Sequence, residues 1–200
     1  MAVVNISYRL APDPIYPAQI EDCLEALDWI RNHASKYNLD IERIGAMGYS
    51  AGAHLAAFVA LLQTPAQRQR AGLTAPWVKK SYPAIKAVVA GGAPLDLTVY
   101  RRSPIVRRFL GRTYQEDPKL YERASPIFYI TPNSPPFFLY HGKRDQLVEI
   151  EQMYKMETAL KSAGIAVETH ESRHGHVASF VFNRKAIQQS IDFLKRKLRV

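Results

Sequence analysis

The sequence lacks the features that mark disulfide-rich, membrane-spanning or exported chains. It has one cysteine, Cys23, so no disulfide can form within the chain. No run approaches the roughly 18 consecutive apolar residues of a membrane span, and no stretch resembles a signal peptide. Cys23 lies in a helical pattern with Leu24 and Leu27, where we expect a small buried hydrophobe and not a nucleophile.

A compact basic motif is also missing, although the chain carries a net charge of +9 from 27 Lys and Arg against 18 Asp and Glu. The basic residues occur in scattered groups, such as Lys79 and Lys80 or Arg101 and Arg102, without interleaved aromatic side chains. Dedicated nucleic-acid recognition concentrates positive charge on one face or helix. We therefore predict no nucleic-acid partner and assign the charge to solubility and to attraction of anionic substrates or surfaces.

Apolar runs alternate with helical patterns along the chain. With 200 residues and 47% hydrophobic content, it can bury one sizeable core, so we expect a single domain over 1–200, or part of one. Short apolar runs predict buried strands over 2–8, 44–47, 85–90 and 136–142, and an alternating pattern predicts a strand over 165–171. Periodic patterns predict helices over 18–37, 54–62, 149–163 and 184–197. Such alternation is typical of an α/β fold with a mostly parallel sheet and helices on both faces.

Two less regular segments interrupt this alternation. Residues 64–83 are polar and basic, and residues 95–135 contain several prolines, with short helical stretches expected near 105–110 and 118–123. Bare loops of this length are uncommon in compact domains. We expect both segments to be irregular, cap-like excursions from the domain.

The stretch Gly48-Tyr49-Ser50-Ala51-Gly52 follows an apolar run and opens an alanine-rich helical pattern. This is the strand, turn and helix context that gives the G-x-S-x-G pattern its meaning as a nucleophile turn. A serine on so tight a turn has strained backbone geometry, and we expect positions 48 and 52 to lie too close together to carry side chains. The alternative is an ordinary glycine-rich turn that happens to contain a serine.

A serine hydroxyl needs a general base within reach and usually a carboxylate that orients the base. Asp145 follows the strand predicted over 136–142, at the strand end where ligand chemistry collects in α/β sheets. Its alternative role is to cap the helix that begins near 149. His174 and His176 flank Gly175 beyond the last predicted strand, and these residues alone do not decide which is the base.

The remaining histidines, His33, His54 and His170, lie within predicted helices or a strand, and we expect packing roles for them. The order of candidates along the chain is therefore Ser, Asp, His. This is the order in which α/β-hydrolases carry their triad.

Several motifs together resemble the hormone-sensitive-lipase-like and feruloyl-esterase-like carboxylesterases of the α/β-hydrolase superfamily. They are Tyr8-Arg9-Leu10-Ala11-Pro12, the Ser50 motif continued through His54-Leu55-Ala56, and the run 135–142 with Asp145. The resemblance implies a serine hydrolase that cleaves small carboxylic esters through an acyl-enzyme, without metal or organic cofactor. In this family the base follows a glycine, which favours His176, although Arg173-His174 replaces the usual small residues.

The resemblance also implies an upstream His-Gly-Gly-type loop whose backbone N–H groups complete the oxyanion hole. The sequence contains no such motif, so the backbone N–H of Ala51 is the donor left from the family's set. We expect an N-terminally truncated hydrolase whose strand near 3–7 either pairs with the strand at 44–47 or leaves a gap. The alternatives are a catalytically impaired remnant, an interaction module, or a peptidase or formamidase on the same fold.

Overall fold

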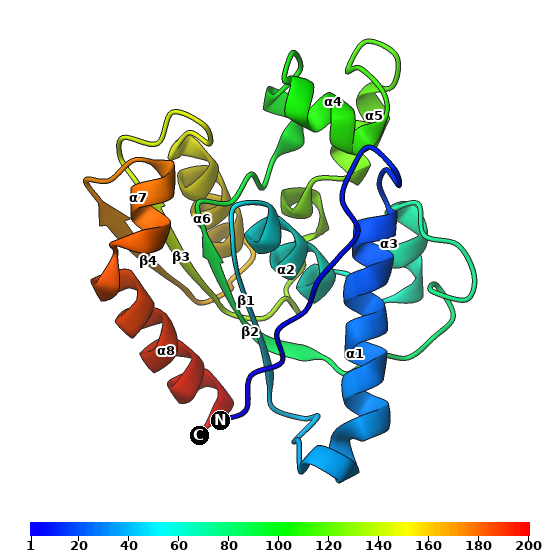
Figure 1. Ribbon diagram of the computed structural model, residues 1–200, viewed down its shortest axis with the longest axis vertical. Helices are drawn as coiled ribbons and strands as arrows, with labels where there is room; N and C mark the ends of the chain where they lie inside the picture. Colours follow the sequence, from blue (N-terminus) through cyan, green and yellow to red (C-terminus); the bar gives the residue numbers. More distant parts are fainter.

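Four parallel strands form the centre of the molecule, described over residues 1–200 by a computed structural model. The sheet has the order β1-β2-β3-β4, with all neighbours parallel (Figure 1). The strands are β1 Ile44–Tyr49, β2 Ile85–Gly91, β3 Phe137–Gly142 and β4 Val167–Ser172. The predicted α/β fold is confirmed, and each crossover places the next strand beside the previous one.

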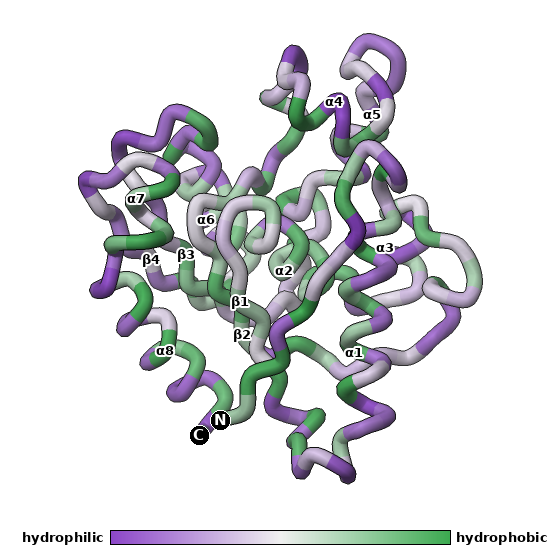
Figure 2. Tube along the Cα trace, viewed as in Figure 1, coloured by the Kyte–Doolittle hydropathy of each residue, from purple (hydrophilic) through white to green (hydrophobic).

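Helices cover both faces of the sheet. The longer ones are α1 Ala18–Tyr37, α2 Ala51–Leu61, α6 Glu151–Ser162 and α8 Arg184–Leu198. The shorter ones are α3 Pro65–Arg70, α4 Pro104–Leu110, α5 Pro118–Arg123 and α7 His176–Val181, and 3₁₀ turns span Leu97–Val99 and Pro126–Tyr129. Polar and apolar residues alternate along α1 and α8 (Figure 2), as expected for helices with one buried face. No helix combines the length and apolar character needed to cross a membrane.

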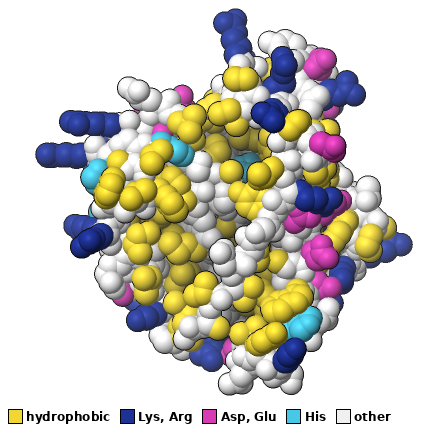
Figure 3. Space-filling model, in the orientation of Figure 1, with side chains coloured by type: hydrophobic (Ala, Val, Ile, Leu, Met, Phe, Trp, Pro, Cys, Tyr) yellow, Lys and Arg dark blue, Asp and Glu magenta, His cyan; other side chains and the backbone are white.

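The two faces of the sheet bury very different cores. Val88 and Leu139 point into a cluster of 32 buried residues shared with α1, α2 and α6. Their neighbours Val89 and Phe138 point into a cluster of 8 buried residues shared with α8. Alternate residues of a strand face opposite sides of a sheet, so the smaller cluster marks a thinly covered face. Apolar side chains gather on the surface over this face (Figure 3).

The prediction of a strand over 2–8 is wrong. Residues 1–10 form no strand and run beside the free edge of β1, largely exposed to solvent (Figure 1). A cavity of about 330 Å³ separates them from β1, lined by Val4 and Ile6 on one side and Ala46 and Gly48 on the other. The apolar pattern was strand-like, but a strand also needs a ladder partner for its backbone groups. Of the two expected arrangements, the gap is the one observed.

The segment 64–83 is held against the end of α2 opposite Ser50. The buried guanidinium of Arg68 donates to the backbone carbonyls of Leu62, Val78 and Lys80. Helix α3, which sequence patterns did not predict, begins with a capping box at Thr64. The segment 95–135 lies instead over α2 (Figure 1). The cap-like role remains a prediction for both.

Candidate active site

Ser50 occupies the turn between β1 and α2. Its backbone has φ 52° and ψ −121°, a left-handed conformation that is costly for a residue with a Cβ. The Ser50 N–H donates to the carbonyl of Gly91 over 2.8 Å, which ties the turn to the end of β2. The hydroxyl therefore lies at the carboxyl end of the sheet, on a turn that is hydrogen-bonded to β2.

The two glycines of the motif, Gly48 and Gly52, differ in the space available for a side chain. A Cβ on Gly48 would overlap the backbone of Gly52, so this position excludes any side chain. A Cβ on Gly52 would meet nothing within 4 Å. The expectation that neither position can carry a side chain is wrong for Gly52, because that residue faces the cavity beside β1.

His176 approaches Ser50 from the other side of the turn. Its Nε2 lies 2.9 Å from Ser50 Oγ, and its Nδ1 lies 2.6 Å from Asp145 Oδ2. A carboxylate accepts, so Nδ1 carries the proton and Nε2 presents a lone pair to the serine hydroxyl. Residues 126 positions apart in the chain thus form one continuous hydrogen-bonded relay.

Asp145 lies in the turn that follows β3, with its side chain fully buried. Oδ1 accepts from the backbone N–H groups of Leu147 and Val148 over 3.0 and 2.9 Å, while Oδ2 faces His176. The alternative role as a helix cap is wrong, because α6 begins at Glu151 without a side-chain cap. Every oxygen of the carboxylate has a partner, which compensates the cost of burying it.

His141 is a member of this cluster that sequence reasoning did not assign. Its Nε2 donates to the carbonyl of Val148 over 2.8 Å and lies 3.3 Å from Asp145 Oδ2. Burial lowers the pKa of His141 below its ordinary value, so the ring stays neutral and fixes the turn by hydrogen bonding. The available signal was its place at the end of a buried strand, four residues before Asp145.

The other candidate base, His174, does not reach the relay. Its backbone carbonyl accepts from the N–H of Arg144, and its N–H contacts Ser172 Oγ. No hydrogen bond joins its ring to Ser50 or Asp145. The structure therefore brings His176 to the serine and leaves His174 in the preceding loop.

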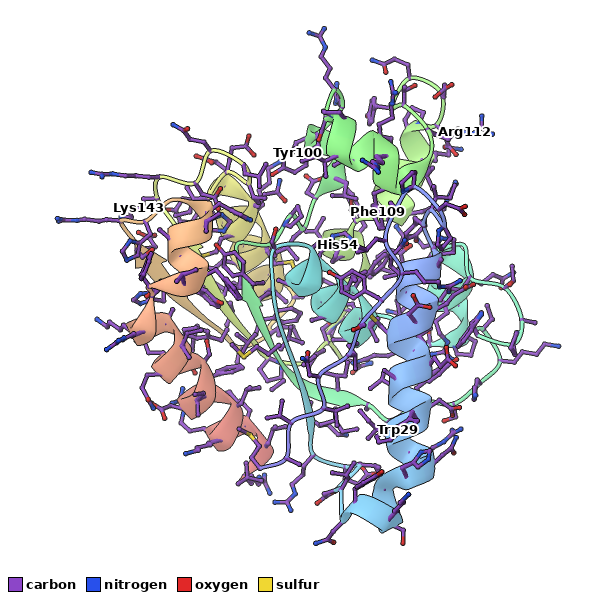
Figure 4. The ribbon with its side chains drawn as sticks, in the orientation of Figure 1. Trp29, His54, Tyr100, Phe109, Arg112 and Lys143 are labelled. Carbon is purple, nitrogen blue, oxygen red and sulfur yellow. The ribbon has the colours of Figure 1, made fainter.

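His54 lies one helical turn after Ser50 on α2. It is buried, and its Nδ1 donates to the carbonyl of Pro94 over 2.7 Å. Burial lowers the pKa of His54 to about 4. Phe109 packs edge-on against its ring, and Figure 4 shows both side chains beneath Tyr100 of the segment 95–135. The packing role expected for His54 agrees with this environment.

Ala51 is the first residue of α2 and is exposed. The N–H groups of a first helical turn have no carbonyl four residues earlier in the helix to bond. They also form the positive end of the helix dipole. The N–H of Ala51 therefore lies at the positive end of α2, next to Ser50. Its role as an oxyanion donor remains a prediction.

A parallel sheet with a serine on a strand-to-helix turn, followed by an aspartate and a histidine after later strands, defines the α/β-hydrolase fold. The chain belongs to the BD-FAE family, because the model of that family matches residues 1–160. The resemblance drawn from the sequence motifs is confirmed at this level.

Several curated relatives of the chain are named as esterases. Esterase LipQ of Mycobacterium tuberculosis is 32% identical over 202 residues, covering 96% of this chain and 47% of LipQ. A probable carboxylic ester hydrolase of the same organism, LipM, is 31% identical over 156 residues, covering 74% of this chain and 35% of LipM. The chain thus spans about half, or less, of the length of these relatives.

Solved structures show the same fold at lower identity. A truncated carbohydrate esterase from gut microbiota matches 98% of this chain and 73% of its own, with TM-score 0.82 and 24% identity. A Lactobacillus rhamnosis esterase inhibited by a tributyrin phosphonate matches 97% of this chain and 65% of its own, with TM-score 0.78 and 19% identity. Likenesses at these identities support the fold alone.

Proposed function

We propose that the chain carries the catalytic centre of a serine hydrolase that cleaves carboxylic esters through an acyl-enzyme. One observation carries the proposal: the relay in which His176 Nε2 lies 2.9 Å from Ser50 Oγ and Nδ1 lies 2.6 Å from Asp145 Oδ2. These are the distances that proton transfer between a nucleophile and its base requires. Esterase names among the relatives support the same reaction class.

In the first half of the reaction, Ser50 Oγ attacks the acyl carbon while its proton moves to His176 Nε2. Asp145 stabilises the imidazolium that forms and keeps its ring oriented. The carbonyl oxygen of the tetrahedral intermediate takes the negative charge and accepts from the N–H of Ala51. When the ester C–O bond breaks, the imidazolium gives its proton to the departing alcohol oxygen, which leaves an acyl group on Ser50.

In the second half, His176 takes a proton from water as the water oxygen attacks the acyl carbon. Collapse of the second tetrahedral intermediate returns that proton to Ser50 Oγ and releases the carboxylic acid. The site begins and ends in the same protonation state. These steps use the side chains and backbone groups already described.

The oxyanion side of this site has a single assigned donor, the N–H of Ala51. Removal of one donor from an oxyanion hole costs roughly 100- to 1000-fold in turnover. We therefore expect the 200-residue chain to turn over esters slowly. A slow but serine-dependent reaction is the specific expectation.

The test compares the purified chain with its Ser50→Ala variant on 4-nitrophenyl acetate and butyrate. We expect turnover by the chain and only background hydrolysis by the variant, with both shown to be folded by circular dichroism. A fluorophosphonate probe should label the chain with one equivalent and leave the variant unlabelled. Equal background rates together with absent labelling would contradict the proposal.

The peptidase or formamidase alternative is tested in parallel, because the fold does not set the substrate. A 4-nitroanilide with the same acyl group as the ester isolates the leaving group. We expect the ester to be cleaved far faster than the anilide. Faster cleavage of the anilide would assign the site to amide substrates.

A further inference from the structure

Tyr49, the residue before the serine, reaches across to the residue that carries the base. Its hydroxyl donates to the backbone carbonyl oxygen of His176 over 2.6 Å. Its ring lies 5.2 Å from the imidazole of His176 and 5.1 Å from the ring of Phe180, measured between centroids. One side chain of β1 therefore contacts both the backbone and the ring of His176.

Tyr140 and Gly92 bound the space around Tyr49, which is partly buried. Tyr140 of β3 lies 5.8 Å away between ring centroids. A Cβ on Gly92 would come within 2.7 Å of Tyr49 Cζ, so the absence of a side chain there makes room for the phenol. The ring cannot swing away from His176 without displacing these neighbours, which fixes the direction of its hydroxyl.

Helix α7, which begins at His176, is held on its inner side by Ser179, which is buried with its Oγ 3.2 Å from Ser172 Oγ. Val177 and Phe180 are 71% and 57% exposed, and Val181 and Phe182 are also exposed. The preceding strand, β4, is an edge strand with an exposed burial pattern. Asp145 fixes the Nδ1 of the imidazole but makes no contact with the His176 backbone. On a helix whose apolar residues face solvent, the Tyr49 hydroxyl therefore supplies the side-chain hydrogen bond to the His176 backbone.

We propose that Tyr49 is a positioning residue, whose hydroxyl anchors the backbone of His176 and so keeps Nε2 within hydrogen-bonding distance of Ser50. The inference rests on the proposed function, because it assigns a role in that reaction. Tyr49 adjoins Ser50 in the chain, so this anchor joins nucleophile and base directly. Burial raises the pKa of Tyr49 above its ordinary value, which keeps the hydroxyl protonated as a donor.

The test variant is Tyr49→Phe, which removes the hydroxyl and keeps the ring. The matched control is Tyr140→Phe, a change in a buried tyrosine of the same aromatic group that has no hydrogen bond to His176. Loss of one hydrogen bond corresponds to a factor of roughly 3 to 10. We expect kcat of Tyr49→Phe to fall by that factor with KM within about twofold, and Tyr140→Phe to match the parent chain.

A second readout does not depend on turnover. Amide hydrogen exchange over residues 176–181 should accelerate in Tyr49→Phe by a similar factor and stay unchanged in Tyr140→Phe. Unchanged exchange in Tyr49→Phe overturns the proposal, and so does faster exchange with unchanged kcat in an active chain. If the parent chain shows neither serine-dependent turnover nor labelling, the proposed function fails, and exchange alone then decides whether Tyr49 anchors His176.

Discussion

The two sides of Ser50 differ in how well their groups are packed and hydrogen-bonded. Toward β2, β3 and β4, Asp145 is buried, His176 is partly buried, and both oxygens of the carboxylate have partners. Toward the free edge of β1, the N-terminal residues are exposed, unpaired and separated from the strand by a cavity of about 330 Å³. One side of the serine has its hydrogen-bonding partners in place, and on the other the N–H of Ala51 is the single donor that we propose for the oxyanion.

The difference follows from how each side is assembled. Neighbouring parallel strands end at the same edge of the sheet, so the turns after β3 and β4 bring Asp145 and His176 together once those strands pair. The side of Ser50 proposed to hold the oxyanion faces the free edge of β1. Residues 1–10 run beside this edge but do not pair with it. Changes on the closed side should therefore have large effects, and changes on the open side small ones.

The largest effect is expected at the base. His176→Ala should lower kcat/KM for a 4-nitrophenyl ester by on the order of 1000-fold or more, because the serine loses its proton acceptor. His174→Ala is the matched control, with kcat/KM within about threefold of the parent chain. A large loss in His174→Ala with a small loss in His176→Ala would reverse the assignment of the base.

The next effect concerns the turn itself. Gly48→Ala should lower the free energy of unfolding by about 3 kcal/mol, because the new Cβ overlaps backbone atoms of Gly52 that cannot move aside. Gly52→Ala should be neutral or stabilising by up to about 1 kcal/mol, since its Cβ meets open space and alanine favours the helix. Urea unfolding of both variants measures the contrast.

Equal losses of stability in these two variants would mean that the cavity side is closed in solution. The sequence alone did not distinguish the two glycines, because the motif is symmetric in its letters. Only the position of the cavity beside β1 tells them apart.

Local patterns were enough to predict much of the fold. The helical period defined the bounds of α1, and continuous apolar runs located β2 and β3. The residues Ser50, Asp145 and His176 were nominated because their chemistry and order are restrictive, and the structure brings them together. Their catalytic role remains a proposal that the variants above test.

What the sequence did not predict depends on contacts between distant segments. The run 2–8 has strand-like composition but no partner to pair with. Helix α7 was missed because its apolar side chains point outward, against the usual pattern. The hydrogen bond from His141 to Val148 forms because the turn after β3 folds back on the end of that strand. None of these three features produces a periodic pattern of apolar residues in the sequence.

An effect of intermediate size is expected from pH. His54, one turn below Ser50, has its pKa lowered to about 4 by burial, so the unfolded chain binds a proton between about pH 6.5 and 4 that the folded chain does not. Its contribution to stability is full above about pH 6.5 and falls by roughly 3 kcal/mol as the pH drops to 4. Urea unfolding between pH 7 and pH 4 measures this loss.

The control is His54→Gln, whose amide can still donate to the carbonyl of Pro94 but does not titrate. The parent chain also contains His141, whose pKa is lowered by burial, so only the difference between parent and variant reports on His54. If the unfolding free energy fell equally between pH 7 and pH 4 in the two proteins, a buried, neutral His54 would be contradicted. A smaller loss of unfolding free energy in the variant between pH 7 and pH 4 would show that His54 is buried and neutral in the folded chain.

The smallest effect is expected on the open side, where two isoleucines give a matched pair. Ile20 of α1 is 0% exposed, whereas Ile6 beside the cavity is 39% exposed. Ile20→Ala should cost about 2 to 5 kcal/mol of unfolding free energy, the usual loss for truncation in a packed core. Ile6→Ala should cost under about 1 kcal/mol, because the side chain keeps part of its surface in water and lies beside a cavity instead of in a packed core. A loss at Ile6 that approached the loss at Ile20 would show that residues 1–10 pack against β1 in solution, and the contrast between the two sides of Ser50 would then disappear.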